Sequence, residues 1–245
     1  MSDPKPFGIL GLPRSGTTIL CSVFNSAEAS VCLCEPHWAM IGKRMEPLSN
    51  VVLEEVFGDT GLHCSCPDEI FDVLLEYGRS RGLKHCGVKE TYRNWQKDWG
   101  ANQIINRSDL SFLLAVHRDP RQCFASLKQQ VRVWGKWVWD CDKFVKSYAE
   151  FFEDLKKCGL RVIHVKFEDF CKEGFVCLSK KLAGVADFNF SQKLNPMGKF
   201  AFGDPKAKQS DKIMPECGTA DKAMFLTAPE RQKVDGLYGL YNSVK

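Results

Sequence analysis

Short apolar runs alternate along the chain with segments that carry apolar residues at helical spacing. The run LSFLLAVHR (110–118) is almost continuously apolar, as expected of a strand that helices cover on both faces. Strands that alternate with helices predict right-handed crossovers and therefore an α/β fold, a three-layer sandwich around a mostly parallel sheet of about five strands. The strands are expected at 6–11, 30–35, 85–90, 110–118 and 161–169, and the helices at 17–26, 67–80, 120–134, 140–158, 170–184 and 227–242.

The segment 187–226 breaks this alternation. It is polar and contains several prolines and glycines, which indicates a long ordered loop, and loops of this length are tolerated where they serve a function. The sequence shows no internal repeat, low-complexity tract or linker. We therefore predict a single domain over residues 1–245.

The composition is that of a globular protein, with 44% hydrophobic and 26% charged residues. The net charge of +4 suits an anionic small ligand, but it is too small, and the basic residues are too scattered, to indicate nucleic-acid binding. The sequence has no run of about 18 apolar residues that would span a membrane, and its N-terminus lacks the features of a signal peptide. A cytoplasmic protein with no membrane span is therefore expected.

The 12 cysteines are scattered, and several lie inside apolar runs. This distribution fits buried, reduced thiols in a cytosolic protein better than a disulfide framework. Two local clusters resemble metal ligands, but neither has the C-x₂-C spacing of common zinc sites, and we expect no metal site. The clusters are Cys32, Cys34 and His37, and His63, Cys64 and Cys66.

The first predicted strand runs into GLPRSGTT (11–18), which has the glycine spacing of a phosphate-binding P-loop. Backbone N–H groups at such a strand–loop–helix turn, together with the helix dipole, favour an anion. Thr17 stands where a P-loop has its lysine, and the central strand ends in His117 and Arg118 rather than in an aspartate that would hold Mg²⁺. Asp119 follows, but Pro120 comes directly after it. Fixed cations and N–H groups, rather than magnesium, are expected to form this site.

GLPRSGTT resembles the 5′-phosphosulfate loop of sulfotransferases that use 3′-phosphoadenosine-5′-phosphosulfate (PAPS), in the form found in tyrosylprotein, carbohydrate and bacterial members. The cytosolic branch has lysine where this chain has Arg14. HRDPRQCFASL (117–127) resembles the second motif of the family, in which an arginine and a serine eight residues later hold the 3′-phosphate. The resemblance implies a P-loop-like fold, PAPS as co-substrate, no metal, and nucleotide contacts from Arg14, Ser15, Gly16, Thr17, Thr18, Arg118 and Ser126.

Three weaker similarities lie between and after these motifs. CGVKET (86–91) resembles the family strand whose terminal lysine stabilises charge on the bridging oxygen. The resemblance implies this role for Lys89. The alternative is a solvated lysine at a strand end. VKFEDF (165–170) resembles a structural segment of the family. FGDPKAKQSDKI (202–213) lies where the family closes a late loop over the nucleotide, so Lys206 or Lys208 would reach the 3′-phosphate, but it departs from the R-K-G form of the cytosolic branch.

Transfer to a hydroxyl also requires a base. Glu35 ends the second strand 21 residues after Arg14, a distance similar to that of the catalytic glutamate in the tyrosylprotein branch. A structural glutamate is the alternative, and His37 is the competing base. His117 is expected to pack beneath the nucleotide. Three tryptophans near residues 131–140 would line an acceptor pocket or pack between helices; they are Trp134, Trp137 and Trp139.

The sequence thus predicts a PAPS-dependent sulfotransferase that acts on a hydroxyl or amine acceptor and releases 3′,5′-bisphosphoadenosine (PAP), with Glu35, Lys89 and Arg14 as catalytic residues. Two other classes remain open. One is a P-loop kinase or nucleotide hydrolase, which the missing lysine disfavours. The other is a non-catalytic nucleotide-binding protein of the same fold. Neither the acceptor nor the oligomeric state can be deduced from the sequence.

Overall fold

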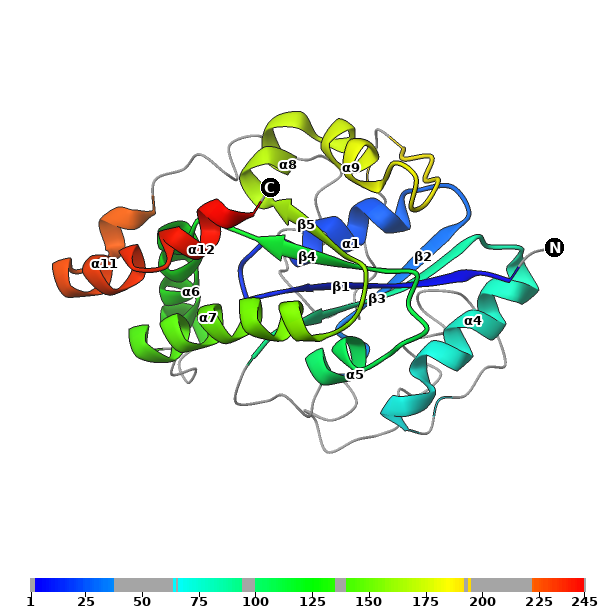
Figure 1. Cartoon of the computed structure of the whole chain (residues 1–245), viewed down its shortest axis with the longest axis horizontal. Helices are drawn as coiled ribbons and strands as arrows, with labels where there is room; N and C mark the ends of the chain where they lie inside the picture. The colour runs from blue at the N-terminus through cyan, green and yellow to red at the C-terminus, as the bar shows by residue number, and fades with distance from the viewer. Residues whose placement is uncertain are drawn as a thin grey trace.

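A computed structural model describes residues 3–37, 64, 66–93, 100–134, 140–191, 194 and 222–244, with only the backbone at 130–134. Its described strands form one sheet in the order β2-β3-β1-β4-β5, and every neighbouring pair is parallel (Figure 1). The predicted α/β fold with a parallel sheet of five strands is confirmed. The strands are β1 (Lys5–Gly11), β2 (Ser30–Cys34), β3 (His85–Thr91), β4 (Phe112–His117) and β5 (Val162–Lys166).

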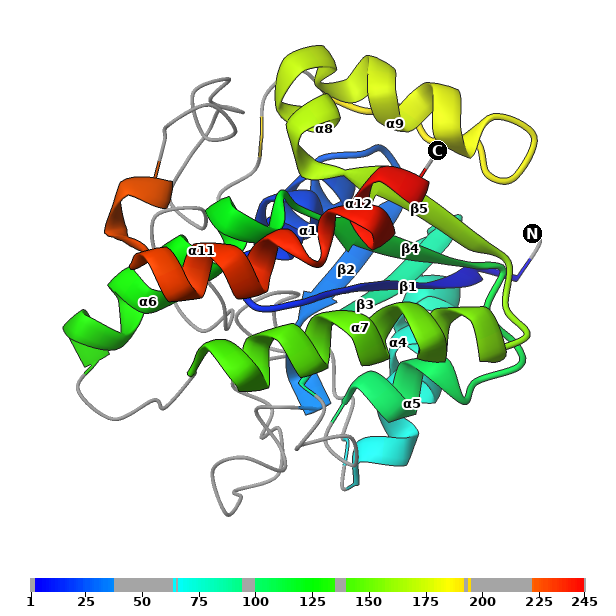
Figure 2. The same cartoon turned by 60° about the vertical axis from the view of Figure 1, so that its left-hand side comes forward.

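Helices cover both faces of this sheet, as Figures 1 and 2 show. Helices α1, α8 and α9 lie on one face, and α4, α5 and α7 lie on the other. Helices α6, α11 and α12 gather near the carboxyl ends of β4 and β5. The helices are α1 (Thr17–Asn25), α4 (Ile70–Arg81), α5 (Ala101–Ile105), α6 (Pro120–Trp134), α7 (Cys141–Lys157), α8 (Phe167–Glu173), α9 (Phe175–Leu182), α11 (Ala228–Asp235) and α12 (Tyr238–Ser243), with 3₁₀ turns η1 (Pro67–Glu69) and η4 (Ala223–Phe225).

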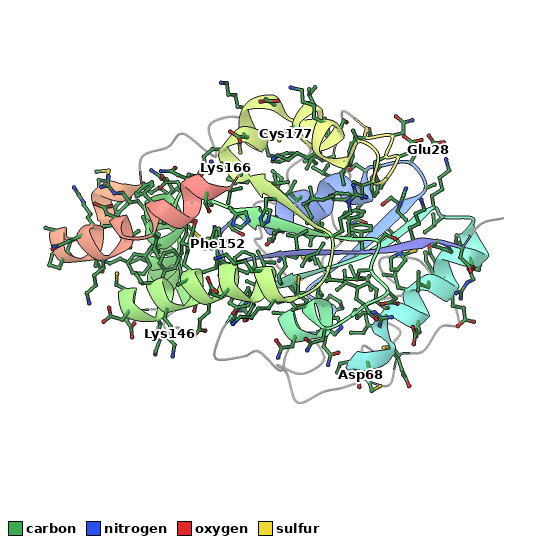
Figure 3. The ribbon with its side chains drawn as sticks, viewed as in Figure 1. Glu28, Asp68, Lys146, Phe152, Lys166 and Cys177 are labelled. Atoms are coloured by element: carbon green, nitrogen blue, oxygen red, sulfur yellow. The ribbon has the colours of Figure 1, made fainter. Side chains whose placement is uncertain are left out.

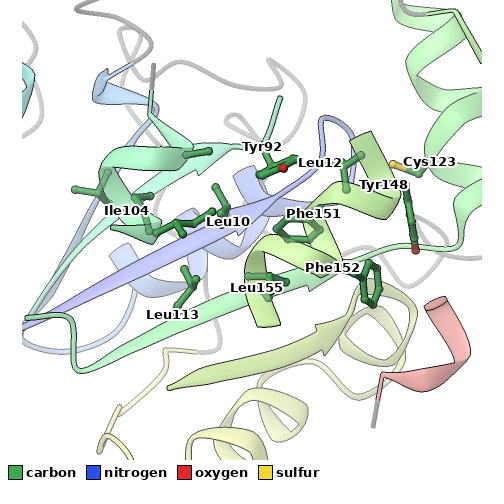
Figure 4. Close-up of a cluster of buried hydrophobic side chains, with 14 of the residues drawn as sticks. Leu10, Leu12, Tyr92, Ile104, Leu113, Cys123, Tyr148, Phe151, Phe152 and Leu155 are labelled. Atoms are coloured by element: carbon green, nitrogen blue, oxygen red, sulfur yellow. The ribbon is translucent and has the colours of Figure 1, made fainter. Parts of the chain in front are cut away.

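Alternate strand residues belong to two separate hydrophobic cores, because successive side chains of a strand point to opposite faces. Ile9 and Leu114 pack with α1, α8 and α9 on one face. Leu10 and Leu113 pack with α4, α5 and α7 on the other, where Phe151 of α7 fills the space above the sheet (Figure 4). Figure 3 shows charged side chains such as Lys146 at the periphery.

Several predicted boundaries were wrong, and glycines or acidic residues explain most of the differences. The fifth strand ends at Lys166, since Glu168 and Asp169 lie in the first turn of α8, where the helix dipole favours acidic residues. Gly174, with a φ of 62°, separates α8 from α9 where one helix was expected. Gly236 ends α11, so the single helix predicted at 227–242 is divided into α11 and α12. Helix α5 was not predicted.

Within the described ranges, no helix is both long and apolar enough to cross a membrane.

Candidate functional site

The loop between β1 and α1 brings backbone N–H groups to the carboxyl edge of the sheet. Strand β1 ends at Gly11, and α1 begins at Thr17, after Arg14 and Gly16 adopt left-handed conformations with φ of 71° and 100°. The first turn of α1 contains no acidic residue. Because the first N–H groups of a helix have no partner within it and carry its positive dipole end, this turn suits an anion.

Close packing requires glycine at both ends of this loop. A Cβ atom at Gly16 would lie 2.1 Å from the ring of Phe167, at the start of α8. A Cβ atom at Gly11 would lie 2.5 Å from Ser15 Oγ and 2.7 Å from the Val116 carbonyl oxygen of β4. The loop therefore packs directly against β4 and the start of α8, and its path is fixed by contacts as well as by backbone preference.

The second motif meets the loop in space. Arg14 Nε donates a hydrogen bond to Ser126 Oγ at 3.3 Å, and Arg118 donates through its Nη1 to the Arg14 carbonyl oxygen at 2.9 Å. The Arg118 guanidinium also lies 5.1 Å from the centre of the Phe167 ring, and its side chain is buried. Three residues singled out separately in the sequence, Arg14, Arg118 and Ser126, therefore form one cluster.

Asp119 and His117 flank Arg118, and both are committed to other contacts. Asp119 Oδ1 accepts a hydrogen bond from Gln122 N at 3.0 Å, and its Oδ2 accepts one from the Tyr238 hydroxyl at 2.6 Å. It therefore caps α6. His117 Nε2 lies 2.9 Å from His164 Nδ1 on β5. Burial lowers the pKa of His117 to about 3, so this imidazole is neutral at physiological pH.

Lys89, inside β3, and Glu35, the residue directly after β2, form a buried ion pair. Lys89 Nζ donates to Glu35 Oε1 at 2.5 Å and to Thr18 Oγ1 at 3.4 Å. The Thr91 hydroxyl donates to the same Glu35 oxygen at 2.5 Å. Only 1% of the Lys89 side chain and 9% of the Glu35 side chain are exposed. The loop thus lacks a lysine of its own, but β3, which pairs with β1, supplies one to the first turn of α1.

The charges of this pair are mutually stabilised. Burial alone would raise the pKa of Glu35, but the positive charges of Lys89 and Arg93 outweigh it and lower that pKa to about 2. Burial likewise disfavours the charged form of Lys89, and the neighbouring Cys34 and Glu35 outweigh it, so the pKa of Lys89 is raised. Both groups are therefore ionised over the whole physiological pH range.

His37, the competing base, belongs to a different cluster. Its Nδ1 lies 3.1 Å from Glu90 Oε1, and its backbone N–H donates to the same oxygen at 2.7 Å. Glu90 directly follows Lys89 on β3. Because adjacent strand residues point to opposite faces, the pair of His37 and Glu90 is separated from Lys89. Sequence reasoning missed both Glu90 and Thr91. For Thr91 a signal was available, because it lies two positions after Lys89 and so shares its face of the strand.

Other predicted residues lie outside the described part of the chain. They are Lys206, Lys208, His63, Trp137 and Trp139, together with the side chain of Trp134. Within the described ranges, no three His, Cys, Asp or Glu side chains are grouped closely enough to hold a metal ion. The 11 described cysteines are free thiols, and most of them are buried.

No family model and no curated protein sequence matches this chain. Its structure, however, is similar to the sulfotransferase domain of an olefin synthase from Synechococcus PCC 7002, with a TM-score of 0.54 and 15% sequence identity over 97% of this chain and 96% of that domain. The chain shares the fold of that domain. A sulfotransferase from Alicyclobacillus acidocaldarius also matches, with a TM-score of 0.46 and 16% identity over 97% of this chain and 96% of the other. In this fold the cluster of Arg14, Arg118 and Ser126 lies at the carboxyl edge of the sheet, where ligands of open α/β sheets bind.

Proposed function

We propose that this protein is a PAPS-dependent sulfotransferase. The observation that carries the proposal is the contact between the two motifs that resemble phosphate-binding segments: Arg14 donates a hydrogen bond to Ser126, and Arg118 donates one to the backbone of Arg14. Arginine is permanently charged and binds phosphate through two parallel hydrogen bonds. A nucleotide with phosphate groups at both its 5′ and 3′ positions matches a cluster that contains two arginines from two motifs.

The donors around the loop fit the 5′-phosphosulfate. Within the described residues, the buried Ser15 hydroxyl has no hydrogen-bond partner, which leaves it able to donate to an oxygen of the ligand. The N–H groups of Gly16, Thr17 and Thr18 stand at the start of α1 and provide further donors. Arg118 and Ser126 would hold the 3′-phosphate. Lys206 remains a proposed further contact.

The reaction needs an acceptor oxygen in line with the sulfur and a base for its proton. The acceptor oxygen forms a bond to sulfur while the bond from sulfur to the bridging phosphate oxygen breaks, and PAP leaves. Lys89 stabilises the negative charge that develops on the bridging oxygen, and Arg14 stabilises the charge on the sulfuryl oxygens. The acceptor proton passes to Glu35 and then to solvent. These residues require no metal for this chemistry.

The Glu35 carboxylate has one oxygen suited to this task. Its two side-chain hydrogen bonds from described residues, those of Lys89 and Thr91, both go to Oε1, which leaves Oε2 for the acceptor hydroxyl. A carboxylate with a pKa near 2 is a weak base, but that value is set by Lys89 and Arg93. The negative charge of a phosphosulfate beside Lys89 opposes their effect, so Glu35 becomes more basic when the nucleotide binds.

The alternative of a P-loop kinase or nucleotide hydrolase fits this site less well. Asp119, the carboxylate placed to hold Mg²⁺ by analogy with such enzymes, caps α6 and accepts a hydrogen bond from Tyr238. A non-catalytic nucleotide-binding protein would share the anion site but would not depend on Glu35.

The free thiols suit a reducing compartment, and we propose that the protein is cytoplasmic. We also propose that residues 1–245 form one domain.

The test is transfer of ³⁵S from labelled PAPS to a set of acceptors: a tyrosine peptide, a phenol, a monosaccharide and an alkyl amine. We expect label in at least one acceptor, with an equal amount of PAP released. Glu35→Gln should retain PAP binding and lower turnover about 10²- to 10⁴-fold, the usual contribution of a general base. Glu76→Gln, an exposed change on α4, is the matched control and should keep the full rate.

Two results would overturn parts of this account. A wild-type protein that neither binds PAP nor transfers label is not a sulfotransferase. A Glu35→Gln variant with the full rate assigns the base elsewhere, and His37→Gln would then be measured in the same assay.

A further inference from the structure

The last helix of the chain contacts the turn that carries Arg118. The Tyr238 hydroxyl donates to Asp119 Oδ2 at 2.6 Å, and the Tyr241 hydroxyl donates to Glu168 Oε2 at 2.8 Å. Figure 2 shows α11 and α12 running beside α6 toward the end of β5. Two tyrosines, one helical turn apart, thus reach the elements that follow β4 and β5.

The two carboxylates that accept these bonds are joined through the backbone. Asp119 N donates to Glu168 Oε1 at 3.0 Å, while Asp119 Oδ1 caps α6 through Gln122 N at 3.0 Å. The result is one connected network that runs from Tyr241 through Glu168 and Asp119 to Tyr238. Asp119, which joins the other members of this network, directly follows Arg118.

Further contacts fix the position of this network. Arg121 donates to both carboxylate oxygens of Asp235, at 2.5 and 2.6 Å, and its guanidinium lies 5.7 Å from the centre of the Tyr238 ring. Lys166 Nζ lies 4.8 Å from the centre of the Tyr241 ring. The Tyr148 hydroxyl donates to the Arg118 carbonyl oxygen at 3.2 Å. The backbone of Arg118 is therefore held from α7 and, through Asp119, from α12.

Both tyrosines act as donors throughout the physiological pH range. Burial, with the adjacent Asp119 carboxylate, raises the pKa of Tyr238, and burial with Glu168 raises that of Tyr241. Hydroxyls that stay protonated keep donating to the carboxylates. The donors of the network are therefore constant over this range, while burial raises the pKa of the acceptor Glu168.

We infer that Tyr238 and Tyr241 are positioning residues that set Arg118 for the 3′-phosphate, so that selectivity for nucleotides bearing a 3′-phosphate depends on α12. This inference rests on the proposed function, because it assigns the 3′-phosphate to Arg118. The two tyrosines act on Arg118 through Asp119 and Glu168. The network touches no reacting atom, and its effect is limited to the geometry of one phosphate contact.

The experiment compares the affinities of PAP and of adenosine 5′-monophosphate, which lacks the 3′-phosphate, by calorimetry. In the Tyr238→Phe/Tyr241→Phe double variant, PAP affinity should fall roughly 5- to 30-fold, the loss expected from one or two hydrogen bonds. The monophosphate affinity should fall clearly less than that of PAP, because the bond of Arg118 to the loop goes to the Arg14 carbonyl oxygen, which is not a donor to the ligand. Tyr77→Phe on α4, also a half-buried tyrosine, is the matched control and should change neither affinity.

Each outcome separates the two proposals. An unchanged ratio of the two affinities in the double variant, or an equal fall of both, overturns the role of α12. A wild-type protein with equal affinity for both nucleotides contradicts the assignment of Arg118 to the 3′-phosphate, and with it the proposed function. Thermal unfolding is measured in parallel, and if the double variant is unfolded, the two single variants give the same ratio test.

Discussion

Lys89 and Glu35 show how a buried charge pair links three elements at the residue scale. Lys89 extends from β3 to Thr18 at the start of α1 and to Glu35 at the end of β2. Glu35 adopts a left-handed conformation with a φ of 55°, and its N–H donates to the Lys89 carbonyl oxygen at 2.6 Å. Removing one partner of such a pair leaves a buried charge uncompensated, which costs about 3–5 kcal/mol.

This pair predicts how stability changes with pH. The folded-state pKa of Glu35 is lowered to about 2 from an ordinary value of 4.5, so its contribution is fully present above pH 4.5 and is lost as the pH falls toward 2. Urea unfolding of wild type and Glu35→Gln between pH 7 and pH 3 measures this. The excess free energy of unfolding of the wild type should be constant above pH 5 and should shrink below about pH 4.5. A difference that stays constant down to pH 3 contradicts the pairing.

Most of the residues that sequence reasoning identified at the site lie in contiguous motifs. Arg14, Arg118 and Ser126 belong to segments whose spacing carries the information, and the structure brings them together. Glu90 lies inside the CGVKET segment, but it was missed because its pairing with His37 spans 53 positions. Lys89, which supplies the lysine that the loop lacks at position 17, was recognised by resemblance. Its hydrogen bond to Thr18 could be found only in the structure.

At the scale of elements, the loop between β1 and α1 depends on glycine at its junction with α1. Gly16 has a φ of 100°, and a Cβ atom there would lie 2.1 Å from the Phe167 ring. The turn that begins α1 and the start of α8 are therefore in direct contact, so a change in one displaces the other.

Gly16→Ala is expected to lower the free energy of unfolding by more than the about 1–3 kcal/mol of backbone strain alone, because it adds a clash with Phe167. Gly184→Ala is the matched control. Its φ is 72°, but nothing lies within 4 Å of the added Cβ, so only strain is expected. Chemical unfolding of both variants gives the comparison, and equal losses would show that the packing of the loop against α8 is unimportant.

The strands and long helices of this chain were predictable because their apolar periodicity is strong. Helix α7 is an example: its buried residues include Phe144, Tyr148, Phe151 and Leu155, at helical spacing. The errors fall where periodicity continues through a break, as at Gly174, where the left-handed backbone ends α8. Five-residue α5 was missed because one turn contains too few apolar positions to establish a period.

At the scale of the whole molecule, the order of the strands brings the site together. Strands β1 and β4 are neighbours in the parallel sheet, so the loop after β1 and the turn after β4 leave the same edge side by side. Strand β3 is the other neighbour of β1 and brings Lys89 to the same edge. Parallel pairing was predictable from the alternation of strands and helices. The contact of α12 with Asp119 was not, because a long-range contact between two polar side chains leaves no periodic signal.

The central claim is that this edge of the sheet holds a bisphosphorylated adenosine without magnesium. Calorimetric titration of the wild-type protein with PAP, beside ATP with and without Mg²⁺, tests it most directly. We expect PAP to bind tightly and independently of Mg²⁺, and ATP to bind weakly in both conditions. A preference for ATP that depends on Mg²⁺ would contradict the account and assign the site to a kinase or nucleotide hydrolase.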